Sequence, residues 1–240
     1  MADWRERAEL LFKKEGLERL KNAHVMVVGL GGVGSFAAEF LARAGVGAMT
    51  IVDGDIVDIT NINRQLPALH STIGQPKVTI VGDRLMDINP ELKLIRIKEF
   101  LSPERAYELV TPEYDYVLDC IDSITPKLNL LISARRQKVK IISNMGAGGK
   151  YEASKIKVTD ISKTEYCPLA KTVRKRLKKE GITKGVKVVF STEYPDQSSL
   201  KMTDGTNFKK SFFGTNSWMP ALFGLHSAET VVKYLIKEKE

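Results

Sequence analysis

The stretch VMVVGLGGVG, residues 25–34, decides the fold of this chain. Its first four residues have the continuous apolar character of a buried strand, and residues 36–44 after the glycines have the pattern of a helix. In this order of strand, glycine-rich turn and helix, a GxGxxG pattern indicates a site for a nucleotide phosphate. The pattern does not choose among dehydrogenases, methyltransferases and adenylating enzymes, because all of them use it.

The glycines of this turn have separate predicted tasks. Gly29 permits the tight turn, and Gly34 lets the following helix pack closely against the strand. Gly31 and Gly32 let the backbone approach a phosphate. The helix N-terminus would then offer free N–H groups and the positive end of its dipole to the anion.

The rest of the chain predicts an α/β protein with a Rossmann-like, mostly parallel sheet and helices on both faces. The prediction rests on apolar strands that alternate with helical segments. Strands are expected at residues 49–53, 92–97, 116–119 and 140–143, and helices at residues 5–20, 77–88, 127–136 and from 102 onward. After residue 150 the alternation changes to a small C-terminal α+β extension with strands at 155–159 and 186–191, a basic helix at 168–180 and a terminal helix at 218–236. Between the strand 186–191 and the terminal helix, residues 195–217 are predicted to form a polar loop that is either disordered or a lid over a site.

The chain carries a positive charge that is concentrated in its C-terminal half. Lys and Arg number 37 against 29 acidic residues, so the net charge is +8. The excess lies in the run KTVRKRLKK at residues 171–179 and at Lys184, Lys187, Lys209 and Lys210. Such a run is either a solvated helix face or a track for a polyanion such as RNA.

Two cysteines, Cys120 and Cys167, are present in the whole chain, which excludes a disulfide framework and a cysteine-rich zinc site. The N-terminus has no apolar signal-peptide region, and the apolar stretch 218–236 is interrupted by charged residues. We therefore expect no membrane segment and a cytoplasmic location.

Polar residues beyond the glycine turn favour chemistry at the α-phosphate of ATP. Asp53 ends the second strand, where a carboxylate can accept both hydroxyls of a ribose. The run DGDIVDITNINRQ at residues 53–65 and the run GQPK at residues 74–77 follow it. A redox enzyme needs no such cluster of Asn, Arg and Lys, whereas attack on the α-phosphate needs cations for the charge that develops on phosphorus and on pyrophosphate. Asp122, after a further strand, could hold a hydrated Mg²⁺ on the triphosphate.

As a set, these motifs resemble the ubiquitin-activating-enzyme-like (ThiF-MoeB) superfamily of adenylating proteins over the first 145 residues or so. The resemblance implies ATP and Mg²⁺ as cofactors, with Gly32 on the phosphates, Asp53 on the ribose and Asp122 on the metal or the adenylate. It implies phosphate contacts from Asn61, Arg64 and Lys77. The complete predicted nucleotide site consists of Gly29, Gly31, Gly32, Gly34, Asp53, Asp55, Asn61, Arg64, Lys77, Asp122 and Ser123.

In this superfamily an N-terminal arginine reaches the ATP site of the partner subunit, and Arg7 stands at that position. The resemblance therefore implies a homodimer in which Arg7 acts in trans and joins Arg64, Lys77 and Asp122 as a catalytic residue. The alternative is a surface charge on an amphipathic helix.

The second half of the chain distinguishes branches of the superfamily. Activators of sulfur-carrier proteins typically carry two CxxC pairs, which this chain lacks. Residues 146–149, 156–164, 168–177 and 188–191 are instead similar to the tRNA threonylcarbamoyladenosine dehydratases. This implies ATP-dependent cyclisation of a threonylcarbamoyl side chain on a tRNA adenosine through an acyl-adenylate. Residues 1–150 would bind ATP, and residues 151–240 would form a tRNA-binding and dimer-forming extension on the same core.

Two alternatives stay open from the sequence. The chain could activate a ubiquitin-like carrier protein, with that protein or a sulfur-transfer protein as its partner; the missing zinc cysteines and the basic surplus argue against this. A dinucleotide oxidoreductase would explain only the glycine turn and Asp53. Cys167 directly precedes the basic helix, whose dipole would lower a thiol pKa, but an exposed cysteine without a neighbouring histidine is most simply inert.

Overall fold

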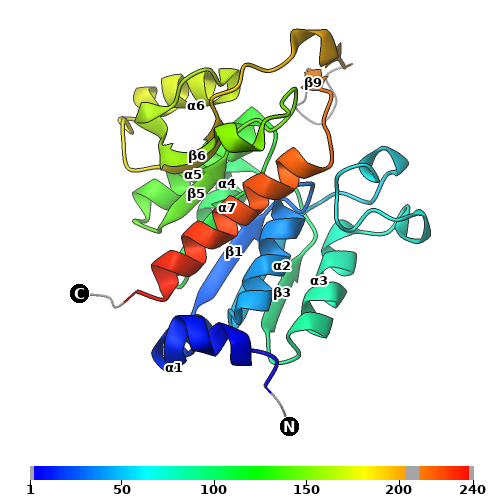
Figure 1. Ribbon diagram of the computed structural model, residues 1–240. Helices are drawn as coiled ribbons and strands as arrows, with labels where there is room; N and C mark the ends of the chain where they lie inside the picture. The colour runs from blue at the N-terminus through cyan, green and yellow to red at the C-terminus, as the bar shows by residue number, and fades with distance from the viewer. Residues whose placement is uncertain (1–2, 204–210, 238–240) are drawn as a thin grey trace.

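A seven-stranded sheet with helices on both faces forms the centre of the computed structural model, which describes residues 3–203 and 211–237 (Figure 1). The strand order is β3-β2-β1-β4-β5-β7-β6; the first six are parallel, and β6 runs antiparallel to β7. The strands are β1 (His24–Val28), β2 (Ala48–Val52), β3 (Lys93–Ile97), β4 (Tyr116–Asp119), β5 (Ile141–Asn144), β6 (Ile156–Asp160) and β7 (Lys187–Ser191). The predicted Rossmann-like, mostly parallel sheet is confirmed.

The helices form one layer on each face of the sheet. The first layer contains α2 (Gly34–Ala44), α3 (Lys77–Ile88) and α7 (Trp218–Leu235), and the second contains α4 (Pro103–Leu109), α5 (Ile124–Arg136) and α6 (Pro168–Lys179). The helix α1 (Glu6–Asn22) lies at the end of the sheet where the strands begin (Figure 1). Short 3-10 helices span Ile59–Asn61, His70–Thr72, Ala153–Lys155, Ile161–Lys163 and Gln197–Ser199.

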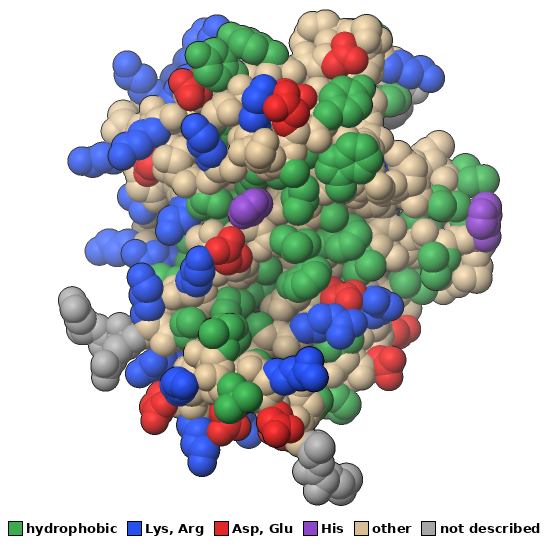
Figure 2. Space-filling model, in the orientation of Figure 1, with side chains coloured by type: hydrophobic (Ala, Val, Ile, Leu, Met, Phe, Trp, Pro, Cys, Tyr) green, Lys and Arg blue, Asp and Glu red, His purple; other side chains and the backbone are tan. Residues whose placement is uncertain are grey.

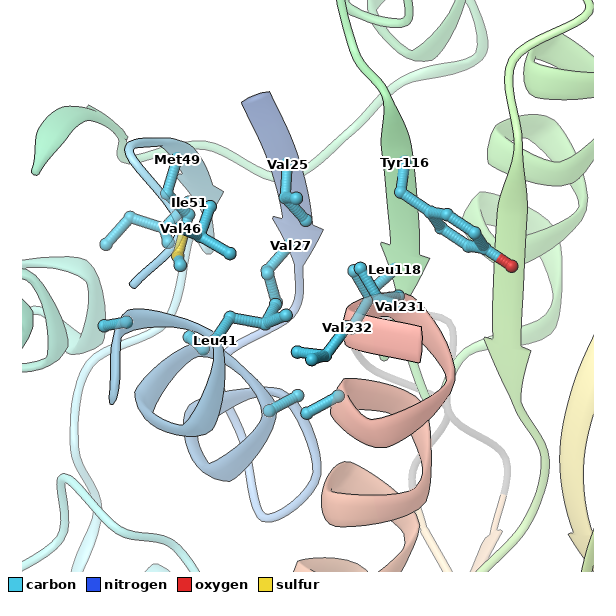
Figure 3. Packing of buried hydrophobic residues seen from close by; sticks show 14 of the residues in the cluster. Val25, Val27, Leu41, Val46, Met49, Ile51, Tyr116, Leu118, Val231 and Val232 are labelled. Atoms are coloured by element: carbon cyan, nitrogen blue, oxygen red, sulfur yellow. The ribbon is translucent and has the colours of Figure 1, made fainter. Parts of the chain in front are cut away.

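The central strands are apolar throughout because they are buried on both faces. Val25 and Val27 of β1 pack into the cluster under α2 and α7, whereas Met26 and Val28 pack into the cluster under α5 and α6. Successive side chains of a strand point to opposite faces, so a strand covered on both sides needs an apolar residue at every position. Figure 3 shows the first of these clusters, with residues from β1, β2, β4, α2 and α7. The sheet, packed on both faces, therefore holds the loops at the carboxyl ends of its strands in fixed positions.

The segment 195–217 differs from the prediction of a polar loop. It contains a two-stranded antiparallel pair, β8 (Leu200–Met202) and β9 (Ser211–Phe213), in addition to a 3-10 helix. Three-residue strands are too short to show a periodicity in sequence, which is why the pattern did not indicate them. Lys209 and Lys210 lie outside the described residues.

The residues after 150 join the same core as the residues before it. Both β7 and β6 extend the central sheet, and α7 packs on α2. The contact is close at Gly224, where an added Cβ would lie 2.4 Å from the carbonyl oxygen of Val33. The proposed boundary at residue 150 stays a prediction. None of the helices in the described ranges is both long and apolar enough to cross a membrane.

Candidate active site

The glycine turn lies between the end of β1 and the start of α2, and its backbone leaves no room for side chains at two positions. Gly29 has φ 89°, in the left-handed region, and an added Cβ there would lie 2.8 Å from the carbonyl oxygen of Cys120. An added Cβ at Gly34 would lie 1.7 Å from the carbonyl oxygen of Gly29. The turn can therefore close only with glycine at both positions, which leaves the N-terminus of α2 facing the loops that follow β2 and β4.

Gly32 brings the turn against the loop that carries the predicted phosphate-binding arginine. An added Cβ at Gly32 would lie 3.0 Å from the carbonyl oxygen of Arg64 and 3.0 Å from Cβ of Pro220 in α7. At Gly31 the nearest atom would be Nε2 of Gln65, at 3.6 Å, which is an ordinary contact. The backbone at Gly31 is thus less crowded by the protein than the backbone at Gly32.

Asp53 follows β2 and lies beside the glycine turn. Its Oδ2 accepts a hydrogen bond from the Leu30 amide at 2.5 Å, and its Oδ1 accepts one from the Asp55 amide at 2.7 Å. Burial raises the pKa of Asp53, and the nearby Lys77 ammonium and these two amides oppose that shift. Because each carboxylate oxygen can accept more than one hydrogen bond, the group retains acceptor capacity for ribose hydroxyls.

Lys77 begins α3, and its side chain is directed back toward the residues after β2. Its Nζ lies 2.9 Å from Oδ2 of Asp55, and its amide donates to the carbonyl oxygen of Asp55 at 3.0 Å. The lysine side chain is only 5% exposed, whereas that of Asp55 is 48% exposed. The ammonium group is therefore held in a fixed position at the edge where the glycine turn lies.

Arg64 lies on the loop after β2, close to Asp122 on the loop after β4. Its Nη1 donates to the carbonyl oxygen of Thr60 and to Oδ1 of Asn63, both at 2.8 Å. Burial lowers the pKa of Arg64, and the negative charge of Asp122 opposes that shift. Asn61, which is buried, accepts a hydrogen bond from the Asp58 amide at 3.2 Å and so helps to shape this loop.

The carboxylate of Asp122 is exposed and accepts a hydrogen bond from Ser123 Oγ at 3.3 Å. Within the described residues no cluster of three or more His, Cys, Asp or Glu side chains could hold a metal ion. A Mg²⁺ that keeps several waters and is held by one carboxylate and by substrate phosphates needs no such cluster, so the donor set fits a hydrated magnesium ion.

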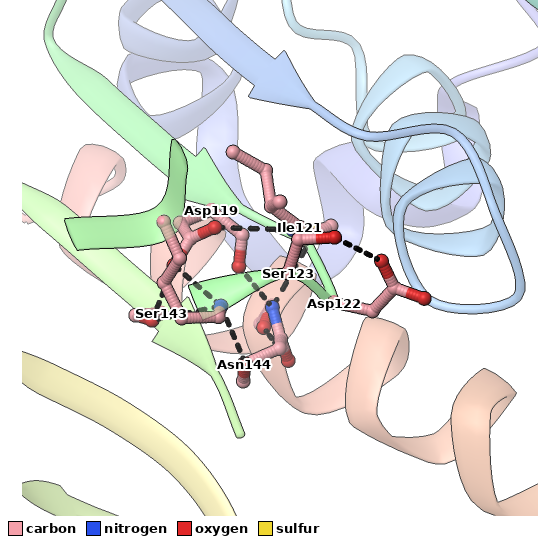
Figure 4. Close-up of polar contacts among 9 residues, drawn as sticks. Asp119, Ile121, Asp122, Ser123, Ser143 and Asn144 are labelled. Atoms are coloured by element: carbon pink, nitrogen blue, oxygen red, sulfur yellow. Dashed lines mark hydrogen bonds and ion pairs between the residues drawn. The ribbon is translucent and has the colours of Figure 1, made fainter. Parts of the chain in front are cut away.

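A buried polar network below this edge was missed by the sequence reasoning (Figure 4). Lys127 Nζ of α5 donates to Asp119 Oδ2 at 2.6 Å and to the carbonyl oxygen of Asn144 at 2.9 Å, and both partners of the ion pair are fully buried. Asp119 also accepts from the Ile121 amide at 3.0 Å and from Ser143 Oγ at 2.5 Å. The network thus fixes the backbone that leads from β4 to Asp122. A lysine on the otherwise apolar face of a predicted helix was the signal that could have revealed it.

Arg7 does not join the other predicted residues within one chain. It is an exposed residue of α1, and this helix lies at the opposite end of the sheet from the start of α2 (Figure 1). The end of α1 is tied to that end of the sheet by the hydrogen bond from the Gly47 amide to the Leu20 carbonyl oxygen at 3.0 Å. The remaining predicted residues, which come from the glycine turn and from the loops after β2 and β4, lie at the carboxyl edge of the strands.

Neither cysteine is placed for nucleophilic chemistry. Cys167 is 5% exposed, so its assumed exposure at the start of α6 was wrong; its side chain packs into the cluster under α5 and α6. Burial raises the pKa of the Cys120 thiol, as does the neighbouring Asp119 charge. Cys120 accepts a hydrogen bond from Asn144 Nδ2 at 3.5 Å and acts as a packing residue.

A Rossmann-like sheet with this glycine turn and with Asp53, Arg64 and Lys77 around it defines a nucleotide-binding α/β protein. The model of the ThiF family matches residues 5–240. Over 241 residues the chain is 45% identical to the tRNA threonylcarbamoyladenosine dehydratase of Bacillus subtilis, covering 98% of this chain and 95% of the relative. The chain belongs to the ThiF family and, within it, to the tRNA threonylcarbamoyladenosine dehydratases.

Two further comparisons show how the likeness is distributed. The crystal structure of the Escherichia coli tRNA N6-threonylcarbamoyladenosine dehydratase in complex with ATP matches with a TM-score of 0.87 at 37% identity, covering 97% of this chain and 94% of that one. The molybdopterin-synthase adenylyltransferase of Escherichia coli is 38% identical over 132 residues, which cover 55% of this chain and 53% of the relative. The resemblance to the dehydratases therefore extends through the C-terminal half, as the sequence motifs indicated.

Proposed function

We propose that this chain catalyses the ATP-dependent cyclisation of threonylcarbamoyladenosine in tRNA, with net loss of one water molecule. The observation that carries the proposal is the 45% identity to a dehydratase of that name over 98% of the chain. The site supports it, because the glycine turn, Asp53, Arg64 and Lys77 meet at one edge of the sheet. An enzyme with this substrate acts where tRNA is present, in accord with the expected cytoplasmic location.

The reaction has two steps, adenylation of the carboxylate and ring closure. In the first, the carboxylate of the threonylcarbamoyl side chain attacks the α-phosphorus of ATP; a bond forms between its oxygen and phosphorus, and pyrophosphate leaves. In the second, a neighbouring atom of the same side chain attacks the activated carbonyl carbon, loses its proton and expels AMP. Because ring closure is intramolecular, its high effective molarity replaces a protein nucleophile. This agrees with the burial of Cys167 and the packing of Cys120.

The cations of the site stabilise the first step. Lys77, held by Asp55, and Arg64, on the loop beside Gly32, would neutralise charge on the five-coordinate phosphorus and on pyrophosphate. Asp53 would accept the ribose hydroxyls, as implied by its place beside the turn. The other proposed nucleotide contacts come from Gly29, Gly31, Gly32, Gly34, Asp55, Asn61 and Ser123.

Asp122 is the proposed magnesium ligand. A hydrated Mg²⁺ on its carboxylate would neutralise the oxygens of the triphosphate. The Lys127–Asp119 pair would act indirectly, by fixing the backbone of this loop. Asp122 would thereby present its carboxylate in one orientation relative to Arg64.

We also propose a homodimer in which Arg7 completes the ATP site of the partner subunit. Within its own chain, the helix α1 that carries Arg7 lies at the end of the sheet away from the glycine turn (Figure 1). The surface of the chain supports association: Leu10 and Leu11 of α1 are 72% and 75% exposed. Figure 2 shows hydrophobic side chains gathered over α2 and α7, where Phe40 is 41% exposed. Contiguous apolar surface of this kind is typical of protein interfaces.

The proposed reaction is tested by detecting its product, the cyclised nucleoside. Purified protein is incubated with ATP, Mg²⁺ and tRNA that contains threonylcarbamoyladenosine, and the digested nucleosides are analysed by mass spectrometry. We expect a nucleoside lighter by one water, formed only when ATP is present. Adenylation of a small carrier protein without any cyclised nucleoside would contradict the proposal. The molybdopterin-synthase adenylyltransferase matches only 55% of this chain, so it supports the ATP chemistry and not a carrier-protein substrate.

A further inference from the structure

Two exposed tyrosines form a contact pair that the proposed ATP chemistry does not use. Tyr166 is 47% exposed and Tyr194 is 69% exposed, and their ring centroids lie 4.9 Å apart at an interplanar angle of 62°. Tyr166 precedes α6, and Tyr194 follows β7, so the pair joins segments distant in sequence. Edge-to-face packing orders the two rings while leaving ring surface open to solvent.

Tyr166 has an unusual backbone conformation for an aromatic residue. Its φ is 55°, in the left-handed region that favours glycine or asparagine over a bulky residue. The protein thus keeps an aromatic side chain just before the basic helix α6 although the backbone conformation there is disfavoured.

A series of hydrogen bonds links the segment that follows Tyr194 to the loop that carries Arg64. The Asp196 amide, two residues after Tyr194, donates to the Gly149 carbonyl oxygen at 2.7 Å, and the Gly149 amide donates to the Gly214 carbonyl oxygen at 2.7 Å. The next residue, Thr215, accepts a hydrogen bond from Asn63 Nδ2 at 2.9 Å. Since Asn63 also accepts from Arg64, the rings and the proposed phosphate-binding arginine lie at the same edge of the sheet.

The helix α6, which begins two residues after Tyr166, carries a row of exposed lysines. Lys171, Lys175 and Lys179 follow one another at four-residue spacing, are exposed, and make no ion pair with any described residue. Carboxylates also lie next to the rings: Glu165 directly precedes Tyr166, and Glu193, which accepts hydrogen bonds from the Tyr151 and Glu152 amides, directly precedes Tyr194. The surface thus combines open aromatic rings with a row of exposed lysines along α6.

We propose that Tyr166 and Tyr194 form a stacking surface for unpaired bases next to the modified adenosine of the tRNA, while the lysines of α6 contact the adjoining phosphates. The inference rests on the proposed function and deepens it by naming how the RNA is held. Aromatic side chains stack on unpaired bases of any sequence, whereas a duplex keeps its bases stacked inside. The reactive nucleotide must leave its own stack to reach ATP, so its neighbours need a surface on which to rest.

The experiment compares a Tyr166→Leu/Tyr194→Leu double variant with a Tyr166→Phe/Tyr194→Phe double variant. The probe is an RNA hairpin whose single-stranded loop contains threonylcarbamoyladenosine, and a fully paired duplex is the second ligand. The leucine variant should bind the hairpin about tenfold or more weakly for each base that loses its stacking partner. The phenylalanine variant should bind it like the wild type. Tyr107→Leu is the matched control, because Tyr107 is 55% exposed on α4.

The salt dependence separates stacking from charge. Stacking releases no counterions, so the leucine variant should lower the affinity without changing the slope of log affinity against log salt concentration. Duplex binding and ATP affinity should not change. Equal hairpin binding by the leucine variant and the wild type would overturn the inference, as would an equal loss in the phenylalanine variant. If the double variant does not fold, Tyr194→Leu alone, at the more exposed position, gives the same readout.

These outcomes are distinct from a failure of the proposed function. If the wild type forms no cyclised nucleoside from modified tRNA and ATP, the proposed reaction is wrong whatever the tyrosines do. If it forms the product and the leucine variant binds and turns over hairpin RNA normally, the reaction stands and the stacking surface does not.

Discussion

At the scale of single residues, the two cations of the candidate site differ in how the protein holds them. Lys77 is almost fully buried and paired with Asp55, whereas Arg64 is held by the Thr60 carbonyl oxygen and Asn63. Replacing Arg64 leaves partners that water can reach, so the cost to folding should be small. Replacing the buried Lys77 also removes a positive charge near the partly buried Asp53, so it should cost more. Catalysis and thermal stability therefore have to be measured together for each variant.

We expect Arg64→Ala and Lys77→Ala each to lower the rate of adenylation by about 100-fold or more, since each would remove charge from the transition state. The measurement is ATP–pyrophosphate exchange in the presence of modified tRNA, with the thermal midpoint as a test of folding. Lys93→Ala is the control, because Lys93 is exposed at the beginning of β3, the opposite end of the strand from the site. A variant that keeps near-normal exchange removes its residue from the catalytic set.

The glycine turn allows a second residue-scale prediction. Gly34→Ala should unfold the turn and destabilise the protein, because the new Cβ would lie 1.7 Å from the Gly29 carbonyl oxygen. Gly31→Ala should fold normally, because its nearest neighbour would be 3.6 Å away, but it should bind ATP more weakly. Thermal melting and ATP titration measure the two effects. Equal stabilities for the two variants would contradict this account of the turn.

At the scale of elements, α6 is the clearest candidate for a contact with the RNA backbone. Its apolar residues Ala170, Val173 and Leu177 are buried, and the lysines at 171, 175 and 179 are exposed. Arg174 is not part of this exposed face, because its Nη1 donates to the Thr164 carbonyl oxygen at 2.9 Å. The helix therefore presents one basic face outward and holds its arginine at position 174 inward.

Charge reversal of Lys171, Lys175 and Lys179 to Glu should weaken tRNA binding and flatten its salt dependence. Each lost phosphate contact lowers the log–log slope by about 0.7 to 0.9, so three contacts lower it by about 2 to 3. ATP affinity should stay constant, since the glycine turn and Asp53 belong to other elements. An unchanged salt slope would mean that α6 is a solvated surface and that RNA is recognised elsewhere.

The pair α2 and α3 is joined by a half-buried ion cluster with a predictable pH dependence. Burial alone would raise the pKa of Glu39, but hydrogen bonds from Arg84 and Arg43 lower it below its ordinary value of 4.5. An acid whose pKa is lower in the folded state stabilises the protein above its unfolded pKa, and this stabilisation is lost as the pH falls through the folded pKa. Chemical denaturation between pH 7 and pH 3 should therefore show a smaller acid-induced loss of stability for Glu39→Gln than for the wild type.

The elements also show which features the sequence could predict and why it could not predict the tertiary contacts. The glycine turn, Asp53 and the helix 77–88 follow from local patterns, because backbone geometry and periodicity are local properties. The partner of Lys127 lies on β4 and that of Asn63 lies beside β9, so these contacts depend on tertiary packing. The burial of Cys167 likewise results from its contact with neighbouring helices, which a position before Pro168 does not reveal.

At the scale of the whole molecule, nearly all of the proposed ATP contacts lie at one edge of the sheet. Parallel strands end at the same edge, so the loops after β1, β2 and β4 bring the glycine turn, Asp53 and Asp122 together, and the loops after β5 and β7 place Gly149 and Tyr194 beside them. Of the proposed contacts, only Arg7 belongs to α1, the helix at the other end of the sheet. A single chain thus holds every proposed ATP contact except one, and that exception gives the sharpest test of the proposed dimer.

Arg7→Ala should inactivate the enzyme, and so should Asp53→Ala, but a mixture of the two variants should recover activity. In a mixed dimer the subunit with Arg7→Ala keeps an intact Asp53 and receives Arg7 from its partner, which restores one of the two sites. With free subunit exchange half of the dimers are mixed, so about a quarter of the wild-type activity should return. Cyclised nucleoside is the readout, and differently tagged subunits verify the exchange. If exchange is complete and no activity returns, Arg7 does not act in trans, and its position on α1 is that of a surface charge.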